Sequence, residues 1–378
     1  MSQGKRVLGA IIGLLLLSLM LSSCGATPVA ENWPGLTQAD GTIFAISGAP
    51  QQVYMLDAET GTQKGTFIPQ GDHRGIAYWS PVAVGNGLAY VGFSDSVSGI
   101  AGLYAFDPET GQEQWNIPAK SLIIPAPVYA DGTVYFGSSD GLAYAVDVES
   151  HTIKPGWPFQ TGEAIWGSPL AVGNRVYVAS QDHFLYCLNA ENAQVIWKVE
   201  VGGAMASQPT LDEKRGVVYV GAFDGKVYAI KADSGEIIDG FEFRAENWIW
   251  SKVLLNEDVL YVTSLDGKLY ALEPETGAVV PPYPFDTSTV GDRDDRIRAA
   301  PVKAGESVIL ATENGRVISV KGGQLQWSWP GGTPTAGILT RPVLSGQTVY
   351  VILQNGQVQA LNAENGGQGW AFTPPQAQ

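Results

Sequence analysis

A repeated unit covers most of the 378-residue chain and constrains its fold more than any other feature. Each copy has an apolar and an aromatic residue, then small residues with Asp-Gly or Asn-Gly, then the phrase apolar-Tyr-Ala-apolar. The first aromatic slot recurs every 41 to 48 residues, at Phe44, Tyr90, Tyr135, Tyr177, Tyr219, Tyr261, Ile309 and Tyr350. A unit of this length is too short to bury a core alone, so eight units must stack or close into a ring.

Each unit predicts four short strands. In the third unit, β-branched and aromatic residues at 126–129, 133–137 and 142–146 alternate with Gly and Asp, and Trp157 follows. Pairs such as Asp140-Gly141 predict two-residue hairpin turns. The later phrase, Asp57 to Gly61 in the first unit, predicts a turn whose leading side chain accepts a backbone N–H. We therefore predict an all-β fold, an eight-bladed β-propeller of four-stranded antiparallel blades.

The repeat resembles the quinoprotein-type, or PQQ-like, repeat of β-propellers, best at residues 227–230 and 269–277. The tryptophans near the end of several units are similar to the docking residue of that family, which the resemblance places between adjacent blades: Trp115, Trp197, Trp327 and Trp370. Quinoprotein dehydrogenases of this type carry a vicinal cysteine disulfide and a calcium site at their quinone. Cys187 has no cysteine neighbour. We therefore expect no cofactor, pyrroloquinoline quinone included, and no enzymatic activity.

The first residues predict export and a lipid anchor. Lys5 and Arg6 precede an apolar run at 7–21 and a small-residue stretch that ends at Cys24. The run is short for a membrane span. Its end resembles a bacterial lipobox, which implies cleavage before Cys24 and a diacylglycerol on its sulfur. We expect the following divisions: a lipoprotein signal peptide at 1–23, a lipid-anchored linker at 24–32, the propeller at 33–372 and a short tail at 373–378.

Charge and composition exclude other classes. The formal net charge is −15, and such a surface repels phosphate backbones, so nucleic acid is excluded as a partner. His73, His151 and His183 stand in three different units, two of them at turn positions, so we predict no metal site. Cys187 takes the Ala slot of its unit and is expected to pack in the core. The run 292–296 alternates Asp with Arg, which indicates a solvated, self-paired loop and not a calcium site.

Loops that lead into each innermost strand hold the candidate site. We align them on Pro81, Pro127, Pro169, Pro209, Lys252, Pro301 and Pro342. The fourth residue upstream is apolar throughout and predicts a structural ring: Ala77, Ile123, Ile165, Met205, Trp248, Ile297 and Ile338. The positions between vary and supply the candidate partner-binding residues Tyr78, Trp79, Trp166, Trp250, Arg298 and Arg341. Large aromatic rings at one mouth of the axial channel either bind a partner or plug the channel.

Eight such repeats, a lipobox and this length together resemble the BamB-like lipoprotein propellers of the outer-membrane β-barrel assembly machinery. The resemblance implies a monomeric scaffold that binds a protein partner in the cell envelope. The protein would be extracytoplasmic, anchored on the outer membrane or on the outer face of the plasma membrane. The shared motifs are blade residues, so two alternatives stay open. One is a quinone- or ligand-binding sensor or quinoprotein dehydrogenase-like protein, and the other is a polysaccharide binder.

Overall fold

The computed structural model describes residues 35–48, 51–71, 75–291 and 295–375. The chain divides into two units, 1–32 and 33–378, and all described residues belong to the second. Their one helical element is the 3-10 helix η1 (Thr287–Thr289). Among them, no helix has the length and apolar character to cross a membrane. The predicted signal peptide, linker and Cys24 lie outside the described residues.

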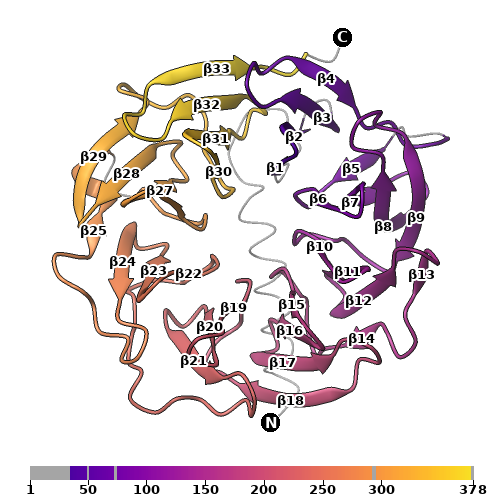
Figure 1. Ribbon diagram of the computed structural model, residues 1–378, viewed down its shortest axis with the longest axis horizontal. Coiled ribbons are helices and arrows are strands. Elements are labelled where there is room, and N and C mark those ends of the chain that lie inside the picture. The colour runs from indigo at the N-terminus through magenta and orange to yellow at the C-terminus, as the bar shows by residue number, and fades with distance from the viewer. Residues whose placement is uncertain (1–34, 49–50, 72–74, 292–294, 376–378) are drawn as a thin grey trace, which may run out of the picture. The chain divides into compact units, whose positions relative to one another are not determined.

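Eight antiparallel sheets follow one another around a ring in chain order, as predicted (Figure 1). Blades one to four contain β1 (Leu36–Ala39), β2 (Thr42–Gly48), β3 (Gln51–Asp57) and β4 (Gln63–Thr66); β5 (Ile76–Tyr78), β6 (Ala83–Gly85), β7 (Leu88–Asp95), β8 (Ile100–Phe106) and β9 (Glu113–Ala119); β10 (Val128–Ala130), β11 (Thr133–Gly137), β12 (Leu142–Asp147), β13 (Thr152–Ile153) and β14 (Phe159–Gln160); and β15 (Leu170–Val172), β16 (Arg175–Ala179), β17 (Phe184–Asn189) and β18 (Val195–Glu200).

The second half of the ring repeats the arrangement. Blades five to eight contain β19 (Thr210–Asp212), β20 (Val217–Gly221) and β21 (Val227–Lys231); β22 (Leu254–Asn256), β23 (Val259–Thr263), β24 (Lys268–Leu272) and β25 (Phe285–Asp286); β26 (Val302–Ala304), β27 (Ser307–Ala311), β28 (Val317–Lys321) and β29 (Gln324–Trp329); and β30 (Val343–Ser345), β31 (Thr348–Ile352), β32 (Val358–Asn362) and β33 (Gln368–Phe372). In blade five the fourth strand is reduced to isolated bridges, Ile230 with Ile237 and Lys226 with Arg244.

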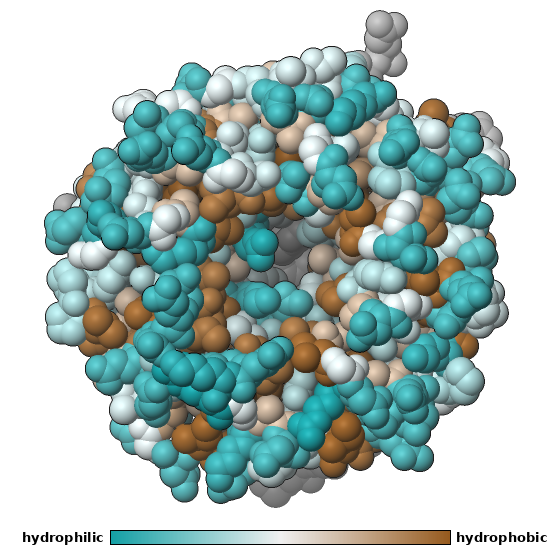
Figure 2. All heavy atoms as spheres, viewed as in Figure 1, coloured by the Kyte–Doolittle hydropathy of each residue, from teal (hydrophilic) through white to brown (hydrophobic). Residues whose placement is uncertain are grey.

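Burial within a blade follows from its two stacked neighbours. The second and third strands are buried on both faces, as in β11, where all five residues are buried. Such strands read as continuous apolar runs because no face is left for water. Outermost strands alternate instead, as β9 does, because one face meets solvent. Figure 2 shows one face of the ring with a hollow at its centre.

The hairpins between second and third strands are confirmed, but their loops differ from the prediction. In blade three the Ser138 amide donates to the Leu142 carbonyl oxygen, so the loop has three residues and not two. Only Gly141 has a positive φ, 82°. The Asp140 carboxylate accepts from the Leu142 amide instead. This is the three-residue hairpin loop, in which only the last position needs the left-handed conformation.

Tryptophans at the seams between blades confirm the docking prediction. The indole Nε1 of Trp197 donates to the Ala232 carbonyl oxygen of blade five at 3.1 Å, and Trp327 donates to Ala363 of blade eight at 3.1 Å. At the third such seam, a Cβ on Gly61 would lie 2.4 Å from the Trp370 ring. Gly61 of the turn phrase therefore has two roles. It adopts a φ of +72°, and its lack of a side chain leaves room for the docked ring.

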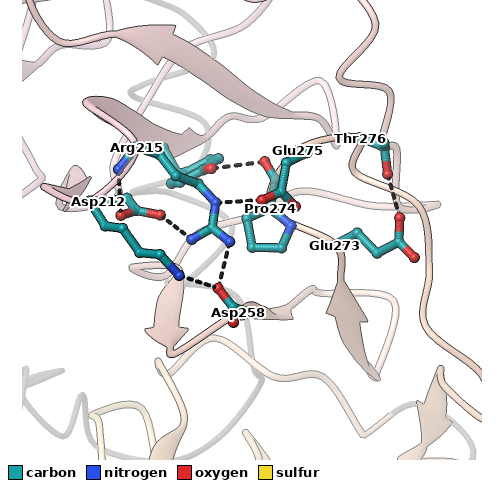
Figure 3. Close-up of polar contacts among 9 residues, drawn as sticks. Asp212, Arg215, Asp258, Glu273, Pro274, Glu275 and Thr276 are labelled. Carbon is teal, nitrogen blue, oxygen red and sulfur yellow. Dashed lines mark hydrogen bonds and ion pairs between the residues drawn. The ribbon is translucent and has the colours of Figure 1, made fainter.

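Blades five and six meet without a docking tryptophan. Phe241 packs there on Tyr219, at 5.7 Å between ring centroids. Arg215 adds ion pairs with Asp212 (2.8 Å), Asp258 (2.6 Å) and Glu275 (2.6 Å) (Figure 3). These acids come from three separate turns of the two blades. The Tyr219 hydroxyl also donates to the Pro274 carbonyl oxygen at 2.8 Å. The seam therefore combines these polar contacts with an apolar cluster of both blades, which includes Tyr219 and Leu260.

The last blade closes the ring by packing against the first. The Tyr350 hydroxyl and the Trp370 indole both donate to the Ala58 carbonyl oxygen, at 2.8 Å and 2.9 Å. Buried side chains of both blades form one apolar cluster, which includes Leu36 and Ile352. Among the described residues, each sheet is built from one continuous stretch of chain. The first and last blades therefore share no strand.

Candidate functional site

Seven loops lead from the outermost strand of one blade to the innermost strand of the next, and we call them the mouth loops. Each contains a five-residue stretch in which the first, third and fifth residues are buried: 78–82, 123–127, 165–169, 205–209, 249–253, 297–301 and 338–342. Burial alternates along these stretches, and the chain bends at the third residue of each. We therefore assign the second and fourth side chains of every loop to the opposite side, toward the axis.

Backbone hydrogen bonds fix this register. In blades three to eight, the carbonyl oxygen just before each stretch accepts a hydrogen bond from a backbone amide in the turn between the second and third strands of the same blade. Ala164 accepts from the Gln181 amide at 3.0 Å, and Trp248 accepts from the Leu265 amide at 3.0 Å. At the third position, the Ser80 hydroxyl accepts from the Gly92 amide. Ser207 makes the same bond to the Gly221 amide. The loops are thus equivalent around the ring.

This register corrects the sequence alignment in blades two and six. There Val82 and Val253 occupy the position that proline holds elsewhere, so the stretch starts one residue later than predicted. Ile249 and not Trp248 fills the buried first position, at 0% exposure. In blade two this position belongs to Tyr78 and not to Ala77. A slip of one residue exchanges the two faces of an extended segment, and this is why the alignment misassigned them.

The second positions form what we call the upper tier: Trp79, Ile124, Trp166, Ala206, Trp250, Arg298 and Leu339. Three of the predicted tryptophans therefore occupy one equivalent position, in blades two, four and six. Trp166 and Trp250 approach to 5.9 Å between ring centroids although blade five lies between their loops. They meet because that loop carries only the small Ala206 in its second position. A contact across an intervening blade means that these side chains face the axis.

Two further aromatic residues extend this contact into a cluster. Phe223, from the hairpin turn of blade five, stacks on Trp250 at 5.0 Å and on Trp248 at 4.7 Å. Sequence analysis missed Phe223 as a site residue. Its turn position holds Ser139, Gln181, Leu265, Glu313 or Gln354 in other blades, so a single aromatic residue there was the available signal.

Arg298 closes the cluster on the side of blade seven. Its guanidinium carbon lies 4.7 Å from the centre of the Trp250 ring, within range of a cation–π interaction. Its Nε also pairs with Glu313 Oε1 at 2.6 Å. Both side chains are shielded, at 14% and 18% exposure. The structure therefore brings together three of the predicted residues, Trp166, Trp250 and Arg298.

The other predicted residues lie apart from this cluster. Tyr78 is 4% exposed and packs against Phe67 in the core of blade two, so its ring is not on the mouth surface. Trp79 shares the upper tier, but its indole donates to Ser94 within its own blade. Arg341 belongs to the fourth position, described next.

The fourth positions form what we call the lower tier: Pro81, Ala126, Ser168, Gln208, Lys252, Ala300 and Arg341. Burial lowers the pKa of Lys252, and the positive charge of Arg341 lowers this pKa further. Burial likewise lowers the pKa of Arg341, although water reaches its side chain. A side chain that faces the axis has protein atoms on all sides, which lowers the pKa of a cation even where water reaches it. Two cations of the lower tier therefore lie close enough to repel each other.

Other candidate groups are structural. His151 and His183 adopt positive φ values of 55° and 74°, which confirms their turn positions; His73 lies outside the described residues. Cys187 is fully buried in β17, and burial raises its pKa to about 11. Cys187 is a free thiol, so it does not form the vicinal disulfide that the resemblance implies at a quinoprotein site.

The acidic run is only partly described, since residues 292–294 lie outside the described ranges. Asp295 is 2% exposed and accepts from the Asn314 amide, so this residue is not part of a solvated loop as predicted. Within the described residues, no group of three or more His, Cys, Asp or Glu side chains is placed to hold a metal ion.

Comparison with known families gives one match over most of the chain. The family model described as outer membrane protein assembly factor BamB matches residues 49–157, 151–253 and 224–376. Among curated proteins, tetrathionate hydrolase of Acidithiobacillus ferrooxidans is 24% identical over 205 residues. That alignment covers 48% of this chain and 40% of the hydrolase, so the chain spans less than half of that relative.

Three solved structures share the fold. BamB from Moraxella catarrhalis has a TM-score of 0.68 at 18% identity, over 86% of this chain and 92% of that one. The computationally designed protein Ika8 has a TM-score of 0.71 at 14% identity, over 89% and 98%. A europium-containing methanol dehydrogenase has a TM-score of 0.63 at 12% identity, over 86% and 81%. At such identities these likenesses establish the propeller fold alone.

Proposed function

Because the chain belongs to the family of the outer membrane protein assembly factor BamB, we propose that it is a lipid-anchored, extracytoplasmic scaffold that binds a protein partner in the cell envelope. Its role is binding and not catalysis. The family supports the envelope location, and the lipobox-like sequence ending at Cys24 supports the anchor. Assembly of membrane proteins is the process that the family name indicates for this scaffold.

The mouth cluster carries the proposal. Trp166, Trp250 and Phe223 pack beside Arg298, and each is only partly buried. Aromatic and arginine side chains dominate the energy of protein interfaces, most of all where they cluster at the centre of a patch. Their rings are held by neighbouring blades, so little entropy is lost when a partner covers them.

The likeness to two enzymes supports a second candidate, a ligand-binding or oxidoreductase role. Quinone uptake by the purified protein, followed by its absorption spectrum, separates this candidate from the scaffold. A polysaccharide binder would stack sugars on the same tryptophans and would be retained on a glycan column.

Affinity capture of the full-length protein from its own membranes tests the scaffold. Trp166→Ala and Trp250→Ala should each weaken capture of the partner by about 1 kcal/mol or more, while the melting temperature stays nearly unchanged. Leu325→Ala is the matched control, because Leu325 is 44% exposed on the outermost strand β29. If the tryptophan variants melt several degrees lower and still capture the partner, the rings plug the channel and the proposal fails.

A further inference from the structure

The lower tier contains two cationic side chains that make no polar contact within the described part of the fold. Within the described residues, Lys252 and Arg341 have neither a hydrogen bond nor an ion pair. Cations nearer the rim are compensated, since Arg298 pairs with Glu313 and Lys268 with Glu246. The protein as a whole carries a net charge of −15. Two cations without a partner in the same tier repel each other, and an anion between them would remove this repulsion.

The tiers also have an order along the axis. Each mouth loop runs toward its innermost strand, so the lower tier lies nearer the channel and the upper tier nearer the outside. A ligand that enters end-on therefore needs an anionic group at its leading end and an apolar or aromatic body just behind it.

The upper tier holds one more unused group. The indole Nε1 of Trp166 is buried and lacks a hydrogen-bond partner among the described residues. Buried donors in native structures normally have a partner, so an unpaired one needs an explanation. A carbonyl oxygen of a ligand lying against the Trp166 and Trp250 rings would accept this hydrogen bond.

From these observations we propose that the channel mouth binds the carboxyl terminus of a polypeptide that ends in apolar residues. The terminal carboxylate lies between Lys252 and Arg341, whose guanidinium matches a carboxylate with two parallel N–H groups. The last apolar side chains lie against Trp166, Trp250 and Phe223. The inference rests on the proposed function, because it specifies which part of a partner enters this mouth.

Peptide binding to the full-length protein in detergent tests it. The probes are an N-acetylated heptapeptide ending in Val-Ile-Phe with a free carboxylate, the same peptide as its C-terminal amide, and N-acetylphenylalanine. Isothermal titration should show the free acid binding at least about tenfold more tightly than the amide, because hydrogen bonds to a charged group are lost. Equal affinities for acid and amide overturn the proposal. Equal affinities for peptide and N-acetylphenylalanine overturn it as well and assign the site to small carboxylic acids.

Charge variants locate the carboxylate. Lys252→Met and Arg341→Met should each abolish most of the preference for acid over amide, and their thermal stability should hold or rise because a repulsion is removed. Lys120→Met is the matched control, since it removes an equal charge from an exposed site and should leave binding unchanged. If the preference survives in both variants, the carboxylate binds elsewhere and the proposal is wrong. Partner capture that needs Trp250 but shows no such preference would leave the scaffold standing and refute only this inference.

Discussion

In five blades, a single side-chain oxygen fixes the turn phrase. Asp107 Oδ1 accepts from the Glu109 and Thr110 amides, both at 2.8 Å. Asn189 makes the equivalent pair of bonds in blade four. The backbone hydrogen bond from Thr110, followed by that from Glu109, lowers the pKa of Asp107. The turn therefore needs only an acceptor oxygen, which Asp or Asn can supply. A pH dependence of its stability arises only where that oxygen belongs to a carboxylate.

Asp107→Asn should accordingly keep its stability at pH 7, because the amide oxygen accepts the same bonds, whereas Asp107→Ala should lose about 1 kcal/mol. A folded-state pKa below the unfolded value of about 3.9 stabilises the protein above that pH, and this contribution is lost as the pH falls through the folded-state pKa. Thermal unfolding between pH 2.5 and 7 should show the wild type losing more stability than Asp107→Asn. Identical acid sensitivity would contradict this account.

Blades are held together by repeated contacts at their seams. Three indoles donate to equivalent carbonyl oxygens of the next blade, those of Ala58, Ala232 and Ala363. Between blades five and six, Phe241 packs on Tyr219 in place of the indole, and Arg215 adds ion pairs to Asp258 and Glu275. The sheet of blade five keeps three strands.

Trp197 provides the test of an indole seam. It is 8% exposed, so Trp197→Ala should cost about 3 to 5 kcal/mol, the range for truncating a buried aromatic side chain. Val195→Ala on the same strand is the control, because Val195 is 45% exposed and should change stability by no more than about 0.5 kcal/mol. Chemical denaturation of both variants measures the difference. A loss under about 1 kcal/mol for Trp197→Ala would show that the seam does not depend on this ring.

At the scale of the whole molecule, the sequence repeat predicted the features that recur in every blade, and it did not predict the features that differ between blades. Asp-Gly turns and aromatic slots define eight blades because every blade needs them at the same offset. The mouth register was wrong in blades two and six because Val82 and Val253 fill the same buried position as proline. The contact of Trp166 with Trp250 depends on Ala206 of a third loop, and the Arg215 seam joins residues up to 60 positions apart. One sequence without its fold gives no signal for such pairings.

Attachment to the membrane is a property of the whole protein and is tested at Cys24. Cys24→Ser should release the protein from the membrane fraction or block its processing, because acylation requires the cysteine sulfur. Detergent partitioning and cell fractionation measure the change, with Cys187→Ser as the control that keeps the lipid site. Unchanged partitioning of Cys24→Ser would refute the lipid anchor.

The closure of the ring has a consequence for how such a chain can be rearranged. The seam between blades eight and one uses a tryptophan, a turn carbonyl and a shared apolar cluster, as other seams do, and no strand crosses it. The break in the covalent chain therefore falls at a seam that differs little from its neighbours. Circular permutation, with the two ends of the propeller joined near residues 35 and 375 and new ends opened in a mouth loop, would leave every described sheet intact.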